Sequence, residues 1–167
     1  MTLMILEIIT VPNPILTTKT QPVAKITPDV LKLAQDMIET CKQAQGIGLA
    51  APQIGKSIRL CVVNLEHMGI PLFALINPKI KKKSWKKSEM EEGCLSIPGI
   101  YGIVRRPDKI KVGALNLKGQ ENELSADGLL ARVIQHEVDH LDGILITSKL
   151  VRRTDGTETK DRKKLKD

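Results

Sequence analysis

The amino-acid sequence predicts a single α+β domain, because strand-like segments and two helical segments occupy separate parts of the chain. The chain has 167 residues, which is enough for one domain and leaves little room for a second. Apolar residues make up 41% and charged residues 27%, an ordinary globular composition that excludes a disordered or fibrous chain over most of its length. We expect one domain over residues 1–150 and a basic, polar tail over residues 151–167.

The first half of the chain is predicted to contain one helix and several strands. Leu3–Ile9 is a short, mostly apolar segment without the features of a signal peptide, and we expect it to be the first strand. Thr27 and Pro28 are typical of the first residues of a helix, and apolar residues recur at helical spacing from there to about Gln43. The further strand candidates are Ile58–Leu65 and Phe73–Ile80.

Between this helix and the next strand, Gly46–Gly55 has a composition that ends regular structure. It contains three glycines and one proline in ten residues. Small side chains allow the backbone to approach another group closely. We expect Gly46 and Gly48 to leave their backbone groups accessible, so that an extended peptide could lie beside them as an added strand.

The second half of the chain is predicted to end with a helix. The expected elements are a strand over Lys109–Leu117, a polar turn over Lys118–Glu123, a helix capped by Ser125, and strand-like residues over Ile144–Ile146. Gly143 follows the last apolar residue of the helix, where a glycine commonly ends helices.

This second helix contains the sequence His136-Glu137-Val138-Asp139-His140. Residues four apart lie one turn apart on the same helical face, so both imidazoles can reach one metal ion, with Glu137 placed to accept a proton from water. Leu129 and Val133 precede the histidines on the same apolar face, and we expect them to line an apolar pocket. Two unpaired imidazoles on a buried face would be costly, and a metal ion would explain them.

Two histidines do not complete a metal site, and the residues alone leave the third ligand open. His67 has the character of a surface residue, and Glu158 belongs to the polar tail. Asp139 and Asp142 point to other faces of the helix. Cys94 is the best remaining donor, since it follows a glycine and precedes an apolar segment, although a lone cysteine is also a common small core residue.

Three segments together make the sequence similar to the peptide deformylase family. They are Gly46-Ile-Gly-Leu-Ala-Ala-Pro-Gln53, Glu92-Gly-Cys-Leu-Ser96 and Gln135-His-Glu-Val-Asp-His140, in the family's order. The similarity extends from about Ile5 to Leu150. The resemblance implies a compact α+β domain of mostly antiparallel sheets packed around a central helix that carries the His-Glu-x-x-His motif.

The resemblance also implies an activity and a set of site residues. Cys94, His136 and His140 would hold one divalent metal ion, which we expect to be Fe²⁺, although Zn²⁺, Ni²⁺ or Co²⁺ could occupy such a site. The reaction would be hydrolysis of the N-formyl group from the initiator methionine of nascent polypeptides, with release of formate. Gln53 and the backbone N–H of Leu95 would donate hydrogen bonds to the developing negative charge.

The sequence departs from the family pattern at one position that affects substrate binding. Some bacterial members have an arginine after the second motif that helps to bind the substrate backbone, and Tyr101 stands at that position here. Arg105 and Arg106 are the residues that could compensate for its absence.

Charge and composition limit the partners. The formal net charge is +7, with basic runs over Lys79–Lys87 and in the tail. These runs are typical of a solvated surface, and their alternative role is a salt-sensitive attraction to ribosomal RNA. Aromatic residues are only 2% of the chain, which argues against a base-stacking nucleic-acid platform, and we expect no specific DNA partner.

The sequence also predicts where the protein works. No apolar run is long enough to cross a membrane. Three cysteines without an export signal indicate free thiols in the cytoplasm. Two other functions stay open at this stage: a zinc peptidase that cuts internal peptide bonds, and an RNA-binding module with a structural metal.

Overall fold

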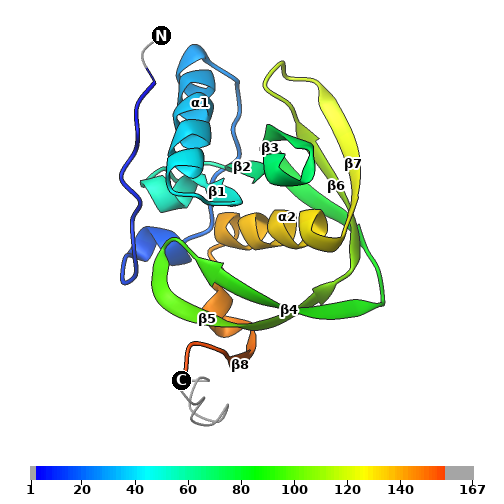
Figure 1. The fold of residues 1–167 in the computed structure, drawn as a ribbon. Coiled ribbons are helices and arrows are strands. Elements are labelled where there is room, and N and C mark those ends of the chain that lie inside the picture. The colour runs from blue at the N-terminus through cyan, green and yellow to red at the C-terminus, as the bar shows by residue number, and fades with distance from the viewer. Residues whose placement is uncertain (1–2, 157–167) are drawn as a thin grey trace.

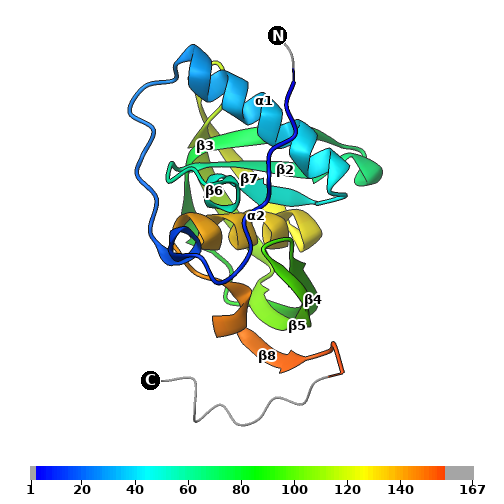
Figure 2. The same ribbon diagram turned by 90° about the vertical axis from the view of Figure 1, so that its left-hand side faces the viewer.

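The computed structural model describes residues 3–156, which form two antiparallel sheets and two α-helices (Figures 1 and 2). The larger sheet has the order β1-β2-β3-β6-β7, and the smaller has the order β4-β5-β8. The larger sheet comprises β1 (Gly48–Ala50), β2 (Leu60–Leu65), β3 (Ile70–Lys83), β6 (Lys109–Leu115) and β7 (Glu121–Asp127). The smaller comprises β4 (Lys87–Cys94), β5 (Ile97–Pro107) and β8 (Leu150–Arg153). The α+β fold is therefore as predicted.

The two helices lie on opposite faces of the larger sheet. Figure 2 shows α1 (Pro28–Gln43) above this sheet and α2 (Gly128–Leu141) below it, with the β4-β5-β8 sheet on the far side of α2. The alternating residues of β2 explain this arrangement, because Leu60 and Val62 pack in the core on the α1 side while Cys61 and Val63 pack on the α2 side. A strand buried on both faces is typically a continuous apolar run, as residues 60–63 are.

The start of α1 is as predicted. The Thr27 side chain accepts a hydrogen bond from the backbone N–H of Val30, and Pro28 is the first helical residue. At the end of α2, Gly143 has a positive φ of 73°, which satisfies the expectation of a glycine just beyond the helix.

Three expected elements are wrong. Leu3–Ile9 is not a strand, because its N–H groups bond to α1 instead of a sheet edge: Met4 donates to Asp36 and Leu6 donates to Thr40. Ser125 does not cap a helix. It lies in β7, where it pairs with Lys111 of β6, and α2 begins only at Gly128. Residues 144–146 do not form a strand either, and Ile146 begins a short 3₁₀ helix.

The start of the expected tail is part of the smaller sheet. We expected the domain to end at residue 150 and the tail to begin at residue 151, but residues 151–153 belong to β8, in which Arg152 and Arg153 pair with Ile103 and Gly102 of β5. Residues 157–167, which include most of the basic tail, lie outside the described residues. No helix within residues 3–156 is long and apolar enough to span a bilayer.

Candidate metal and catalytic site

Cys94, His136 and His140 come together although they lie on two different elements. The sulfur of Cys94, at the end of β4, lies 3.2 Å from His140 Nε2, and that nitrogen lies 3.2 Å from His136 Nε2. The ligand atoms of all three residues lie within 4.8 Å of one another. The alternative interpretation of Cys94 as an ordinary core residue does not explain this convergence.

The chemistry of these donors fits a divalent ion. Metal–nitrogen bonds of about 2.0 Å and metal–sulfur bonds of about 2.3 Å place tetrahedral ligands roughly 3.3–3.6 Å apart, close to the separations observed here. Burial and the adjacent His136 hold the pKa of His140 well below its usual range. A neutral His140 ring leaves a nitrogen lone pair for coordination.

Glu137 lies beside this group in a buried position. Its Oε2 atom has no hydrogen-bond partner within the described residues, although the side chain is only 3% exposed. Burial raises the pKa of Glu137 to about 7, despite the opposing effect of His136. A carboxyl group with a pKa near neutrality is suited to accept and return a proton at physiological pH.

Gly48 makes room for this carboxylate. A Cβ atom added at Gly48 would lie 2.3 Å from Glu137 Oε1, closer than any real contact. The expectation that glycines in this segment permit a close approach is therefore correct at this position, and Glu137 is the group approached. Any other residue at position 48 would displace Glu137.

Gln53 is fixed with its amide nitrogen toward Cys94. Its side-chain oxygen accepts a hydrogen bond from the Ala50 N–H at 2.9 Å. Its nitrogen donates to Ser96 Oγ at 3.1 Å and lies 3.6 Å from Cys94 Sγ. The side chain is 2% exposed. This orientation brings an N–H donor next to the group of metal-ligand candidates.

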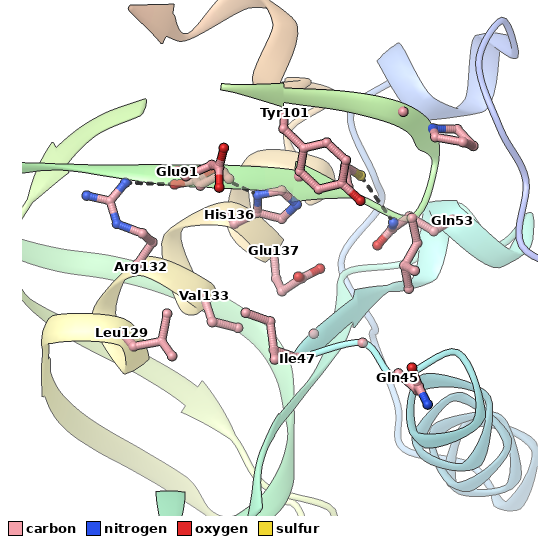
Figure 3. A pocket seen from close by; sticks show the side chains of 18 residues that line it. Gln45, Ile47, Gln53, Glu91, Tyr101, Leu129, Arg132, Val133, His136 and Glu137 are labelled. Atoms are coloured by element: carbon pink, nitrogen blue, oxygen red, sulfur yellow. Dashed lines mark hydrogen bonds and ion pairs between the residues drawn. The ribbon is translucent and has the colours of Figure 1, made fainter. Parts of the chain in front are cut away.

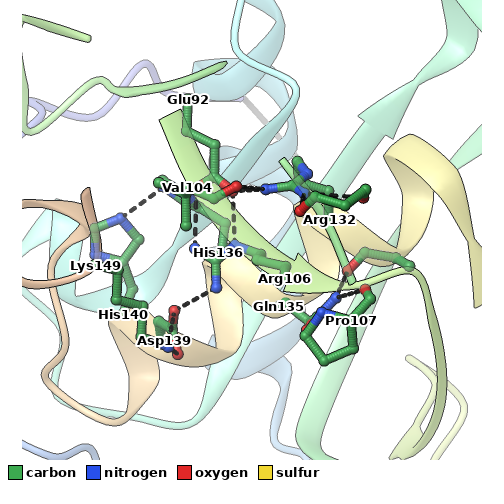
Figure 4. A network of polar contacts seen from close by, with 12 residues as sticks. Glu92, Val104, Arg106, Pro107, Arg132, Gln135, His136, Asp139, His140 and Lys149 are labelled. Atoms are coloured by element: carbon green, nitrogen blue, oxygen red, sulfur yellow. Dashed lines mark hydrogen bonds and ion pairs between the residues drawn. The ribbon is translucent and has the colours of Figure 1, made fainter. Parts of the chain in front are cut away.

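A buried network of charged side chains contacts His136 at Nδ1, the ring nitrogen that does not face His140 (Figure 4). Glu92 Oε2 lies 3.0 Å from His136 Nδ1. Both Glu92 oxygens also accept hydrogen bonds from Arg106, at 2.6 and 2.9 Å, and Oε1 accepts another from Arg132 at 2.8 Å. Burial works against the charge of Glu92, but Arg106 and His136 hold the pKa of this carboxyl well below its usual range. The ionised Glu92 orients the His136 ring so that Nε2 faces Cys94 and His140.

Arg106 and Arg132 are occupied by this network. Arg106 also donates to Asp139 at 2.6 Å, and Arg132 donates to the backbone oxygens of Val104 and Ser88, both at 2.9 Å. Both arginines are at most 4% exposed. Arg106 is thus not free to replace the substrate-binding arginine that the sequence lacks, and Arg105 lies on the exposed surface.

One cavity of about 460 Å³ collects most of the expected site residues (Figure 3). It is lined by Gly46, Gly48, Gln53, Cys94, Leu95, Leu129, Val133, His136 and Glu137. Figure 3 shows Leu129, Val133 and Ile47 on one side of Glu137 and Tyr101 on the other. This volume suits a small organic ligand or a side chain with part of its peptide.

The rejected candidates for the third ligand lie elsewhere. His67 is exposed in a 3₁₀ helix, Asp142 pairs with Arg59 at 2.7 Å, and Asp139 pairs with Arg106 and Lys149. Glu158 lies outside the described residues.

Sequence reasoning missed the supporting role of Glu92 and Arg132. Glu92 stands in the second motif, but no pattern assigned it a partner. Arg132 is four residues before His136 and therefore lies on the same inward face of α2. A charged residue on an otherwise apolar face was the available signal, because such a residue must find a buried partner.

A His-Glu-x-x-His helix joined by a cysteine from a neighbouring strand defines a metal-dependent hydrolase site. The family model described as polypeptide deformylase matches residues 5–155, and the chain belongs to this family. It is accordingly a metal-dependent hydrolase that removes the N-formyl group from the initiator methionine of nascent polypeptides and releases formate.

Individual relatives cover nearly the whole chain. A peptide deformylase of Dictyoglomus thermophilum is 50% identical over 94% of this chain and 100% of the relative. Among solved structures, a Thermotoga maritima peptide deformylase has a TM-score of 0.84 and 38% identity, covering 88% of this chain and 98% of that chain. An Acinetobacter baumannii enzyme solved with Met-Ala-Ser bound has a TM-score of 0.83 and 33% identity, covering 89% of this chain and 100% of that chain.

Proposed function

We propose that Cys94, His136 and His140 hold one Fe²⁺ ion and that Glu137 is the acid–base residue of deformylation. The observation that carries this proposal is the convergence of three metal-ligand atoms beside a buried carboxylate oxygen that has no hydrogen-bond partner within residues 3–156. When bound, the ion supplies Lewis-acid chemistry and lowers the pKa of water. Thiolate and imidazole ligands also suit Zn²⁺, Ni²⁺ and Co²⁺.

Glu137 handles the protons in this mechanism. Its carboxylate accepts a proton from the attacking water and later donates it to the amine that leaves the formyl carbon. The burial that raises its pKa to about 7 suits both steps. Gly48 supports this role, because its missing side chain lets the carboxylate lie against the wall of the cavity.

Gln53 and Leu95 stabilise the negative charge that develops on the formyl oxygen. The amide nitrogen of Gln53 points toward Cys94, and Leu95 lies in the turn between β4 and β5, immediately after Cys94. An N–H donor held before the reaction begins needs no reorganisation, and removing one typically costs about 100- to 1,000-fold in rate.

Substrate binding follows from the shape of the cavity. Leu129 and Val133 offer an apolar wall for the methionine side chain, and the backbone of Gly46 and Gly48 offers hydrogen bonds to an extended peptide. We expect the enzyme to act in the cytoplasm, near the ribosome. The three cysteines, all free in the structure, are consistent with a reducing compartment.

A formate-release assay on formyl-Met-Ala tests this proposal. The protein is purified without oxygen, because an iron–thiolate centre is vulnerable to oxidation. Glu137→Gln keeps the shape of the side chain and removes its basicity, so we expect a loss of about 100- to 10,000-fold in kcat while the metal content stays the same.

The matched control is Glu89→Gln, which removes a carboxylate from an exposed position on β4 outside the cavity. This variant is expected to release formate at the wild-type rate. Equal activity of the wild-type protein and Glu137→Gln would refute the role of Glu137. Cleavage of unformylated peptides would indicate a peptidase instead.

A further inference from the structure

The turn between β3 and β4 carries an exposed tryptophan among lysines. We define the lysine tip as Lys82, Lys83, Trp85, Lys86 and Lys87. Trp85 is 100% exposed, and it is the only tryptophan of the chain. The four lysines are also exposed. A fully exposed indole contributes no burial to folding, so the fold does not account for its position.

The backbone of the tip is held in place although its side chains are free. The Ser84 N–H donates to the Lys109 carbonyl at 2.9 Å, and the Lys109 N–H donates back to Ser84 Oγ at 3.1 Å. The Lys86 carbonyl accepts from Ser84 Oγ at 2.7 Å and from the Asp108 N–H at 3.0 Å. These bonds join the tip to the β5–β6 connection. Trp85 is therefore displayed on an ordered turn.

The positive charge of the tip is poorly neutralised. Lys82, Lys83 and Lys87 form no ion pair with any residue between 3 and 156, and Lys86 lies 3.6 Å from Asp108 while remaining 87% exposed. Lys82 also faces Lys111 across the β3–β6 pairing, where Lys111 is paired with Glu123 at 3.0 Å and Lys82 is not. The tip therefore attracts an anion.

We propose that the lysine tip is a docking site for single-stranded segments of RNA. One base stacks on the Trp85 ring, and the surrounding lysines contact successive phosphates. This is a single stacking contact, not the platform of several rings that the low aromatic content argues against. An anionic membrane fits less well, because insertion needs a broad apolar face and the tip offers one ring. This proposal rests on the proposed function and deepens it. Docking on RNA would hold the enzyme near an RNA-rich source of nascent chains.

The geometry leaves the catalytic cavity open when the tip is occupied. The tip lies at the edge of the molecule, where the chain leaves the larger sheet (Figure 1). From there β4 runs eight residues to Cys94, a length of about 25 Å. RNA bound at the tip is therefore separated from the substrate by the length of one strand.

The sole tryptophan is itself the reporter for the test. Wild-type protein is titrated with a single-stranded RNA of about 12 nucleotides, with the matching duplex, and with anionic vesicles. Stacking predicts quenching of Trp85 fluorescence by the single strand without a blue shift, and weaker binding of the duplex. A blue shift with vesicles, or no response to the single strand, would overturn the proposal.

Two variants and one control distinguish binding at the lysine tip from general attraction to positive charge. The affinity of each is measured by the fluorescence anisotropy of labelled RNA. Trp85→Ala is expected to weaken binding about tenfold. The double change Lys82→Gln and Lys83→Gln is expected to reduce the slope of log affinity against log salt by about 1.4, at about 0.7 per phosphate contact. The control, Lys163→Gln with Lys164→Gln, removes the same charge from the tail and should leave Trp85 quenching unchanged. The proposal fails if Trp85→Ala binds as tightly as wild type or if the tail control alone abolishes binding.

Formate release from formyl-Met-Ala distinguishes this proposal from the catalytic one. The variants of Lys82, Lys83 and Trp85 should release formate at the wild-type rate, because none of these three residues lines the cavity. Loss of RNA binding with intact formate release supports the tip as a separate docking site. Loss of formate release in Trp85→Ala would contradict that separation.

Discussion

Charged side chains occupy two contrasting settings at the two ends of β4. Near its carboxyl end, Glu92 is buried and accepts hydrogen bonds from two arginines while orienting His136. At its amino end, the lysine tip is exposed, and its positive charge has few acidic partners. The same strand thus carries charge that is fully paired inside the protein and charge that is left unpaired on the surface.

This contrast explains why arginines accompany the buried carboxylate while lysines carry the exposed charge. A buried charge is tolerated only when every donor and acceptor around it is satisfied, and the planar guanidinium of arginine can do this for a carboxylate through two parallel bonds. Exposed lysines remain hydrated and need no partner within the chain. Buried charge therefore fixes geometry, and exposed charge remains available to a partner.

Removing the carboxylate of Glu92 should have the largest effect. Glu92→Gln leaves Arg106 and Arg132 without their shared buried anion, and breaking a buried pair typically costs about 3–5 kcal/mol of unfolding free energy. Loss of the Glu92 contact to His136 should also lower metal affinity by about 10- to 100-fold. Urea denaturation and competition with a chelator measure the two effects.

The exposed Glu89→Gln variant serves as the reference for Glu92→Gln. Glu89 lies on the same strand, and the one ion pair that it forms within residues 3–156, to Arg152, is solvent-exposed. If both variants unfolded at the same urea concentration, the buried network would have no special part in stability.

An intermediate effect is expected at Asp36, which ties the amino-terminal segment to α1. It accepts hydrogen bonds from Lys32 and from the Met4 N–H. Burial opposes its charge, but these partners lower its pKa below the usual value. Its contribution to stability is therefore present above an unfolded-state pKa of about 3.9 and is lost as the pH falls through the lower folded-state value.

Asp36→Asn should accordingly destabilise the protein by about 1–2 kcal/mol at neutral pH, and the difference from wild type should shrink below about pH 4. Denaturation curves across this pH range test the expectation, with the exposed Glu7→Gln as the control. A difference that grows toward acid pH would mean that the assigned direction of the pKa shift is wrong.

The smallest effect is expected at Glu123, whose carboxylate is exposed between Lys81 and Lys111. These lysines lower its pKa, but water and salt screen the interaction. Glu123→Gln should leave the thermal midpoint unchanged at physiological salt and lower it slightly at low salt. A marked loss of stability at high salt would contradict the distinction between exposed and buried pairs.

Much of the fold could be predicted because its signals are local. The capping residues and apolar spacing of α1 lie within one segment, as do the apolar strands of the larger sheet. In contrast, β4 was not predicted, because Lys87–Cys94 is polar, has half of its residues exposed and becomes a strand only through its pairing with β5. Leu3–Ile9 has the composition of a strand but meets a helix instead of a sheet edge.

By itself, the sequence determined that two imidazoles share one face of a helix, since a spacing of four residues fixes that face, and that Glu137 follows the first of them directly in the chain. The three motifs added the family and its chemistry. Only the tertiary structure brought Cys94 to His140, Gln53 to Cys94 and Arg132 to Glu92, because these pairs are 40 or more residues apart in the chain. Periodicity describes which face of an element is buried, but the packing of sheets around α2 decides which distant groups that face meets.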